Sequence, residues 1–188
     1  MPAEQRPEHD QETTGTVATT AALRSLTREV EEFVAGAGWD QSPQLFALVP
    51  TADLVQRQPE LAGQVDADSA LTPIAQEQLP SADLAQALAE IIWPRAVHGC
   101  VVAQEIVVLP PDVERELDAR GEDSEHLRRI AAEHPRRREG RMVAAVLRDG
   151  VRACVLRLRA ADEFPEEIVE HPDLAPNLTT ALHQTLHD

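Results

Sequence analysis

The amino-acid sequence predicts an α+β domain, an antiparallel sheet of about five strands with helices packed on it. The first observation is a hairpin pattern over residues 141–159, where two apolar, strand-like runs flank Asp149-Gly150. The second is a helical pattern over residues 21–35, where apolar side chains repeat at intervals of three and four. The third is the order of the expected elements. Strands do not alternate regularly with helices, and this favours an antiparallel sheet.

The expected elements can be placed in order along the chain. The helix at 21–35 carries one apolar stripe, made of Leu23, Leu26, Val30, Phe33 and Val34. After it we expect a strand at 45–49, a short helix from 51 and a weak strand at 71–78. Ser81 then caps a helix that Pro94 stops, and this helix has Leu84, Leu88, Ile91 and Ile92 on one face. The remaining elements are a strand at 98–109, helical pieces at 112–117 and 124–132, the hairpin, an acidic loop at 162–172 and a last helix from 174 to 186.

Single residues give further local expectations. Thr51 can cap the short helix, and Pro73 confines its strand to an edge or an end of the sheet. The polar pair Gln104-Glu105 interrupts the long strand, at a bulge or at an exposed crossing. Gly121 indicates a turn between the two helical pieces.

The dipeptide Asp149-Gly150 predicts a tight hairpin turn with a loop of two residues. Both residue types tolerate a positive φ, as a primed turn requires. In that register Arg148 lies opposite Val151, and Val146 lies opposite Ala153.

Length and composition indicate one domain. A chain of 188 residues with 43% apolar residues can bury a sizeable core. Residues 1–18 are acidic and have few large apolar side chains, so we expect a disordered tail there. The single α+β domain then covers residues 19–188.

The charge of the chain excludes several classes of function. The net charge is −16, and all 17 basic residues are arginine. Without lysine there is no Schiff-base lysine and no P-loop lysine. A strongly negative field opposes binding to nucleic acid or to an anionic membrane. We therefore expect neither as a partner.

The same composition indicates a cytoplasmic protein. The first residues contain no apolar stretch typical of a signal peptide, and no apolar run is long enough to span a membrane. Cys100 and Cys154 lie in apolar, strand-like runs. We expect two buried, reduced thiols, although a disulfide is possible if their strands are neighbours.

Two blocks of sequence resemble a known family. One is the run from Gly38 to Thr51, and the other combines Ile92-Trp93-Pro94 and His98-Gly99-Cys100 with the hairpin from Arg148 to Arg159. Together they resemble a family of actinobacterial conserved hypothetical proteins over residues 20–187. The resemblance implies a lineage and a compartment but no reaction. The order of elements is also similar to that of small secretion chaperones, which is an analogy of architecture alone.

Two tryptophans are candidate binding residues. Trp39-Asp40 can form an aromatic platform with a carboxylate at the mouth of a pocket. Alternatively Trp39 packs on the edge of the sheet and Asp40 forms a turn. Trp93 can line a groove, or it can anchor the turn that follows its helix.

An arginine-rich stretch is the third candidate. Residues 128–159 hold ten of the 17 arginines and three acids, a net charge of +7. Within it Arg136, Arg137 and Arg138 can form a patch for an acidic partner. Alternatively the stretch balances the acids of its own domain, and these three residues lie in a solvated loop.

Motifs for catalysis, cofactors and metals are weak or missing. There is no Gly-x-Ser-x-Gly motif and no glycine-rich phosphate loop. His183 and His187 have the i,i+4 spacing of a metal pair, but they lack the internal glutamate of a zinc-protease helix. We expect no catalytic residue, no cofactor and no metal.

These observations favour a non-enzymatic protein- or peptide-binding adaptor. It would use an edge of the sheet or a groove beside Trp39 and Trp93, with a protein partner or a second copy. The alternative is a small-ligand-binding or enzymatic protein with a pocket near Trp39, Asp40, His98 and nearby arginines.

Overall fold

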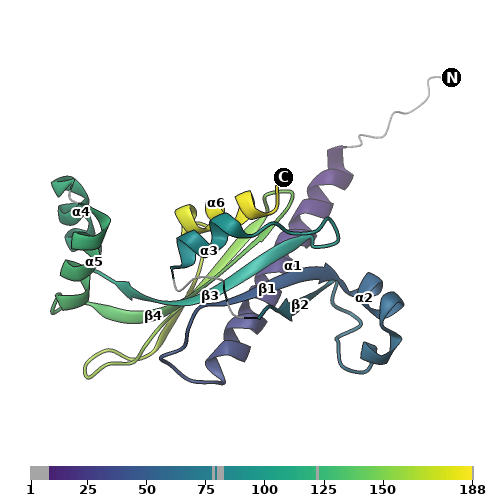
Figure 1. The fold of residues 1–188 in the computed structure, drawn as a ribbon, viewed down its shortest axis with the longest axis horizontal. Helices are drawn as coiled ribbons and strands as arrows, with labels where there is room; N and C mark the ends of the chain where they lie inside the picture. Colours follow the sequence, from purple (N-terminus) through teal and green to yellow (C-terminus); the bar gives the residue numbers. More distant parts are fainter. Residues whose placement is uncertain (1–8, 78, 80–82, 122, 188) are drawn as a thin grey trace.

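A six-stranded antiparallel sheet forms the centre of the protein (Figure 1). This computed structural model describes residues 9–77, 79, 83–121 and 123–187. Across the sheet the strands follow the order β2-β1-β3-β4-β5-β6, and each neighbouring pair is antiparallel. The strands are β1 (Gln44–Pro50), β2 (Leu71–Ala75), β3 (Gly99–Val108), β4 (Arg138–Leu147), β5 (Arg152–Leu158) and β6 (Glu167–Glu170). The predicted α+β class is confirmed.

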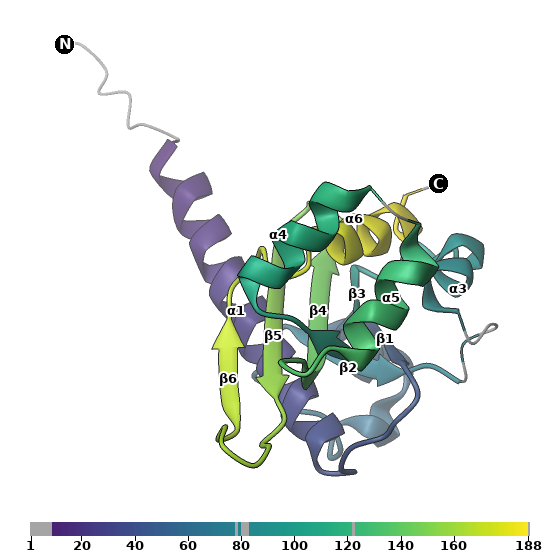
Figure 2. The same ribbon diagram turned by 90° about the vertical axis from the view of Figure 1, so that its left-hand side faces the viewer.

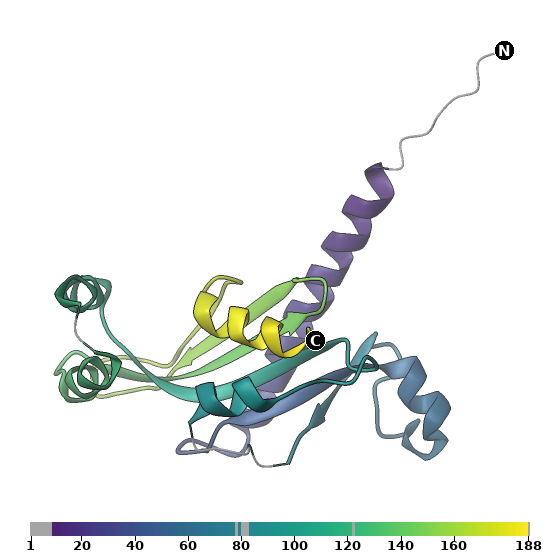
Figure 3. The same ribbon diagram turned by 45° about the horizontal axis from the view of Figure 1, so that its top comes forward.

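Helices lie on both faces of the sheet and at its ends. They are α1 (His9–Ala35), α2 (Thr51–Arg57), η1 (Pro59–Leu61, a 3-10 helix), α3 (Leu84–Glu90), α4 (Pro111–Arg120), α5 (Ser124–Glu133) and α6 (Pro176–Thr185). α1 crosses one face, whereas α3 and α6 cover the other (Figure 3). None of the helices in the described ranges is long and apolar enough to cross a membrane.

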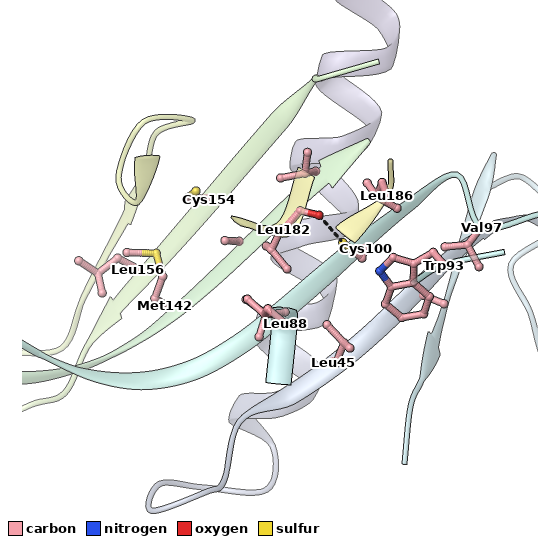
Figure 4. Close-up of a cluster of buried hydrophobic side chains, with 14 of the residues drawn as sticks. Leu45, Leu88, Trp93, Val97, Cys100, Met142, Cys154, Leu156, Leu182 and Leu186 are labelled. Atoms are coloured by element: carbon pink, nitrogen blue, oxygen red, sulfur yellow. Dashed lines mark hydrogen bonds between the residues drawn. The ribbon is translucent and has the colours of Figure 1, made fainter. Parts of the chain in front are cut away.

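Alternate side chains of the central strands feed two apolar cores, one on each face. On β4, Met142 and Ala144 belong to the core under α3 and α6, and Val143 and Ala145 belong to the core under α1. Figure 4 shows the first core, with Leu182 of α6 above the strands. Burial on both faces explains why these strands are apolar at almost every position.

α1 is the predicted helix, but it is longer than expected. It begins at His9, so residues 9–18, expected in a disordered tail, are helical, while residues 1–8 of that tail lie outside the described residues. Once a helix is nucleated on the sheet, each further residue adds one hydrogen bond, so the helix can continue past its contacts. Its first turns project beyond the sheet (Figure 1).

The apolar stripe of α1 is buried with one exception. Leu23, Leu26, Val30 and Val34 are buried, whereas Phe33 is 69% exposed. Phe33 lies one position from Val34, and its ring makes an edge-to-face contact with Phe46 of the core, at 6.3 Å between ring centres. The stripe is therefore narrower than the sequence indicated.

The hairpin between β4 and β5 forms, but its loop has three residues instead of two. The Leu147 N–H donates to the Val151 carbonyl (2.9 Å), and the Gly150 N–H donates to the Leu147 carbonyl (2.9 Å). Gly150 has φ 88, and Asp149 does not share a positive φ. A three-residue loop needs only one such residue, which glycine supplies without strain, whereas the expected turn needs two.

The register of the hairpin therefore differs by one residue from the prediction. Val146 lies opposite Arg152, so the expected pairs Arg148–Val151 and Val146–Ala153 are wrong. Val146 and Ala153 belong to cores on opposite faces of the sheet. The expected register would have turned one of them toward the wrong core, because a slip of one residue reverses every side chain.

β6 is a strand that the sequence did not predict. It lies within the acidic loop expected at 162–172 and pairs with β5, with Leu156 opposite Val169. A strand of four residues with a glutamate at each end is too short a pattern to identify in a sequence, and the pairing with β5 stabilises it. At the opposite edge β2 contains Pro73, as predicted for an edge strand.

α4 and α5 connect β3 to β4 and lie at one end of the sheet (Figure 1), the end that faces the viewer in Figure 2. Val113 and Leu117 of α4 are buried in a small core of their own, against Leu127 and Ile130 of α5. Gly121, with φ 62, forms the predicted turn between them.

The start and the end of α3 differ from the local expectations. α3 is capped by Asp83, whose carboxylate accepts from the Ala85 and Gln86 N–H groups, and the expected cap Ser81 lies outside the described residues. Ile91 and Ile92 follow α3 rather than extend it. A helical conformation is disfavoured before Pro94, so the helix ends early.

Thr51 and Glu105 also take roles other than those expected. Thr51 is the first residue of α2, not its cap, and its hydroxyl hydrogen-bonds that of Thr72 (2.8 Å). Gln104-Glu105 forms no bulge, because the β3–β4 pairing continues through both residues. The polar Glu105 carboxylate is instead used in a contact described below.

Candidate functional site

Trp39 and Asp40 lie in the loop that leads from α1 to β1. Asp40 has φ 67, and its N–H donates to the Glu105 carboxylate (3.0 Å), as does the N–H of Gln41 (3.2 Å). The Trp39 ring lies 4.5 Å from the Arg141 guanidinium carbon, in cation–π geometry. The Trp39 loop is thus held firmly to the sheet.

A buried ion cluster lies next to Trp39, between α1 and the sheet. Glu31 of α1 and Arg141 of β4 are each 1% exposed, with Arg141 Nη1 3.6 Å from Glu31 Oε1. Arg157 of β5 donates to both oxygens of Glu31, at 2.6 Å each. Arg141 Nη2 lies 3.4 Å from Glu105 and also donates to the Gly38 carbonyl. Glu31 raises the pKa of Arg157 by these hydrogen bonds, so Arg157 stays charged.

Trp93 lies on the opposite face of the sheet from Trp39. It is buried in the core under α3 and α6, and its indole N–H donates to the Thr185 hydroxyl (3.0 Å). Figure 4 shows its ring beside Leu45 and Val97. The two tryptophans therefore share no groove, and Trp93 takes the anchoring role that was one of its two expected roles.

His98 is far from Trp39 along β3. It is exposed and directly precedes β3, whereas Trp39 and Asp40 lie beside Glu105, seven residues further on. At about 3.3 Å a residue, this is a separation of about 23 Å. A single pocket containing Trp39, Asp40 and His98 is therefore not formed.

A cavity of about 610 Å³ lies beside His98, between α1 and the ends of β1 and β4. We name it the α1 pocket. Its apolar walls are formed by Ala22, Leu23, Leu26, Pro50, Ala70, Leu71 and Leu147, and its polar residues are Thr19, Ser69, Arg95, His98, Arg148 and Asp149. The α1 residues Thr19, Ala22, Leu23 and Leu26 follow helical spacing and face the pocket from one side.

Three basic side chains line this pocket in two different ways. Arg148 is held by backbone carbonyls, since its guanidinium donates to Val97 (2.7 Å), Pro94 (3.0 Å), Trp93 (3.2 Å) and Leu186. Arg95 and His98 are exposed, and neither side chain has a hydrogen bond or ion pair with the residues the structure describes. These two are available to a ligand.

Two of the three arginine-rich candidates contact acidic residues of the same domain. Arg136 pairs with Asp112 of α4 at 2.6 Å, and this hydrogen bond lowers the pKa of Asp112. Arg137 is exposed. Arg138 begins β4, where it contacts Glu167 (3.4 Å) and the Phe164 ring (5.3 Å). All three lie at the α4–α5 end of the sheet.

His183 and His187 contact each other, with 2.9 Å between their Nε2 atoms. His183 Nε2 is also 3.1 Å from the Arg148 carbonyl. Within the described ranges no three histidine, cysteine, aspartate or glutamate side chains gather as metal ligands would. Cys100 and Cys154 are both buried and free, so the expected buried thiols are confirmed.

The fold and the pocket define an α+β protein with an open apolar cavity between its first helix and its sheet. The family model of the PPA1309-like proteins matches residues 23–187. The chain therefore belongs to the PPA1309-like protein family. No curated protein and no solved structure matches it.

The sequence singled out His98 but missed the rest of the α1 pocket. Its walls come from four segments, 19–26, 50, 69–71 and 147–149, together with 95–98. None of these is a motif by itself. The one available signal was Arg95 and His98, two polar residues at or just before the start of the strand predicted at 98–109.

Proposed function

We propose that this protein is a non-enzymatic binding protein that holds the apolar part of its ligand in the α1 pocket. The observation that carries the proposal is the pocket itself. Its volume of about 610 Å³ lies within the range of small-molecule sites, about 300–1,000 Å³. Apolar walls with a few polar groups at one side are typical of such sites.

A small amphipathic molecule is the first candidate ligand. Both outer strands discourage the addition of a peptide strand, because β2 contains Pro73 and the short β6 has glutamate at each end. The Trp39 and Trp93 side chains form no common groove. The α1 pocket, with about 610 Å³, offers room for such a molecule.

A peptide or protein partner, or a second copy in a homodimer, is the second candidate. Phe33 favours it, because an aromatic side chain 69% exposed is typical of a contact surface. Such a partner would insert an apolar side chain into the same pocket.

We also infer a cytoplasmic location in an actinobacterium. Two free, buried thiols suit a reducing compartment. The chain has arginine and no lysine, a composition typical of proteins from GC-rich genomes, because arginine codons are richer in G and C than lysine codons.

Two neighbouring alanines of α1 provide the test. Ala22 and Ala21 are both exposed, but only Ala22 lines the pocket. The neutral dye Nile red should bind the natural protein and the Ala21→Trp control saturably, with its fluorescence rising in the apolar cavity. Ala22→Trp fills the pocket and should abolish binding. Equal binding to both variants, or no saturable binding to the natural protein, would contradict the proposal.

A further inference from the structure

We propose that the ligand of the α1 pocket is a monocarboxylate with an apolar chain, such as a free fatty acid. This inference rests on the proposed function and adds the chemistry of the ligand's head group. It depends on Arg95, His98 and Arg148, the three basic residues that line this mainly apolar cavity.

Arg95 and His98 can bind an anion directly. A guanidinium and an imidazole N–H both donate hydrogen bonds to a carboxylate. Since neither side chain has a partner among the described residues, a ligand would displace no protein contact. Arg148 donates to four backbone carbonyls, so it adds a fixed positive charge rather than a new hydrogen bond.

The net charge of −16 does not prevent this binding. At physiological salt a charge is screened over about 8 Å, so the charges at the pocket dominate. Asp149 is the one acidic residue of the lining, and its carboxylate already accepts from the Val151 N–H (3.1 Å). The lining therefore has two arginines against one acid.

The apolar walls select the rest of the ligand. Leu23 and Leu26 of α1 line the pocket together with Leu71 and Leu147. Transfer of an alkyl chain from water to a place among these side chains is favourable by about 25 cal/mol of free energy for each Å² of apolar surface that is buried. A small inorganic anion has no such part and would leave these walls empty.

The experiment compares three competitors of Nile red that share one alkyl chain. They are decanoate, decanol and decyltrimethylammonium, used below their micelle concentrations. Decanoate should displace the dye at a concentration about tenfold lower than decanol, as expected for a charge-assisted hydrogen bond. The cation should be the weakest competitor. Equal competition by decanoate and decanol would overturn the carboxylate assignment while leaving the proposed function intact.

Variants locate the head group. The double variant Arg95→Gln with His98→Gln should remove the preference for decanoate and leave competition by decanol unchanged. Arg120→Gln, a similar loss of charge on the distant α4, should keep the preference. Loss of preference in Arg120→Gln as well would show a general charge effect and overturn the proposal.

Two further arms test other anionic ligands that carry apolar groups, a phospholipid surface and a peptide carboxylate. Vesicles of phosphatidylglycerol should not compete, because the chain of a packed lipid is not free to enter the pocket. A short acetylated peptide that ends in two leucines and a free carboxylate should compete less well than decanoate. Stronger competition by the vesicles or by the peptide would overturn the assignment to a free monocarboxylate.

Discussion

Two charged side chains, Glu31 and Arg141, are among the largest buried side chains of the protein. Both are almost completely buried, and the Arg141 Nε has no hydrogen-bond partner among the residues that the structure describes. Isolated charges are very unfavourable in such surroundings, so Glu31 must be matched by Arg157 and Arg141. The cluster fixes the position of α1 on the sheet, because a shifted helix would separate these charges.

Removing one member of the cluster should therefore strongly destabilise the fold. Glu31→Ala removes the carboxylate that neutralises Arg141 and Arg157, so two positive charges remain close together in the interior. We expect a loss of about 3–5 kcal/mol in the free energy of unfolding. Glu29→Ala is the matched control, since Glu29 is exposed on the same helix. Urea unfolding measures both, and the control should change by less than about 0.5 kcal/mol. Similar values for the two variants would show that the cluster does not hold α1.

At the same scale, residue type alone did not decide the role of either tryptophan. Trp39 belongs to a loop, and its ring contacts the Arg141 guanidinium. Trp93 lies in the core, and its indole N–H donates a hydrogen bond to the Thr185 hydroxyl. Each precedes a residue typical of a turn, Asp40 and Pro94. The sequence could rank them as anchors or binding residues, but it contains no information on which face of the sheet each would occupy.

Among the elements, the β4–β5 hairpin depends on one backbone conformation. Gly150 has φ 88, a region that side chains rarely adopt, and branched side chains least of all. Gly150→Val should lower the free energy of unfolding by about 1–3 kcal/mol through backbone strain. Thermal melts of this variant should show the loss, while Gly150→Asn, which tolerates a positive φ, should lose less. An unchanged melt for the valine variant would refute the turn geometry.

The long periodic elements were predictable from the sequence, whereas β6 and the first turns of α1 were not. The stripe of α1 and the apolar runs of β3, β4 and β5 each repeat a pattern over many residues. β6 has four residues, and the first turns of α1 lack a stripe. β6 is ordered by its pairing with β5, and the first turns of α1 are ordered by the rest of that helix.

For the whole molecule, composition gives an unusual dependence of stability on alkaline pH. The chain has no lysine and no tyrosine, so the two cysteines are its only side chains that titrate between about pH 9 and 11. Burial raises the pKa of Cys100 from 9.0 to about 11, and it also raises the pKa of Cys154.

Stability should therefore fall as the pH rises through this range. Above pH 9 the unfolded chain loses its thiol protons while the folded protein keeps them, and this favours unfolding until the folded thiol also ionises near pH 11. We expect a loss of about 2 kcal/mol, measured by urea unfolding at each pH. The loss should shrink in Cys100→Ala and largely persist in Cys154→Ala. A stability independent of pH in the natural protein would contradict the burial of Cys100.

Taken alone, the sequence determined the class of fold, the edge position of β2, the turns at Gly121 and Gly150, and two buried thiols. These features follow from the periodicity of apolar residues and from the conformational limits of glycine and proline, which act between near neighbours in the chain. The tertiary structure decided the hairpin register, the sixth strand, the ion cluster and the α1 pocket. Each depends on which segments pack together on the sheet. This packing is set by burying apolar side chains in both cores, and the positions of the polar side chains follow from it.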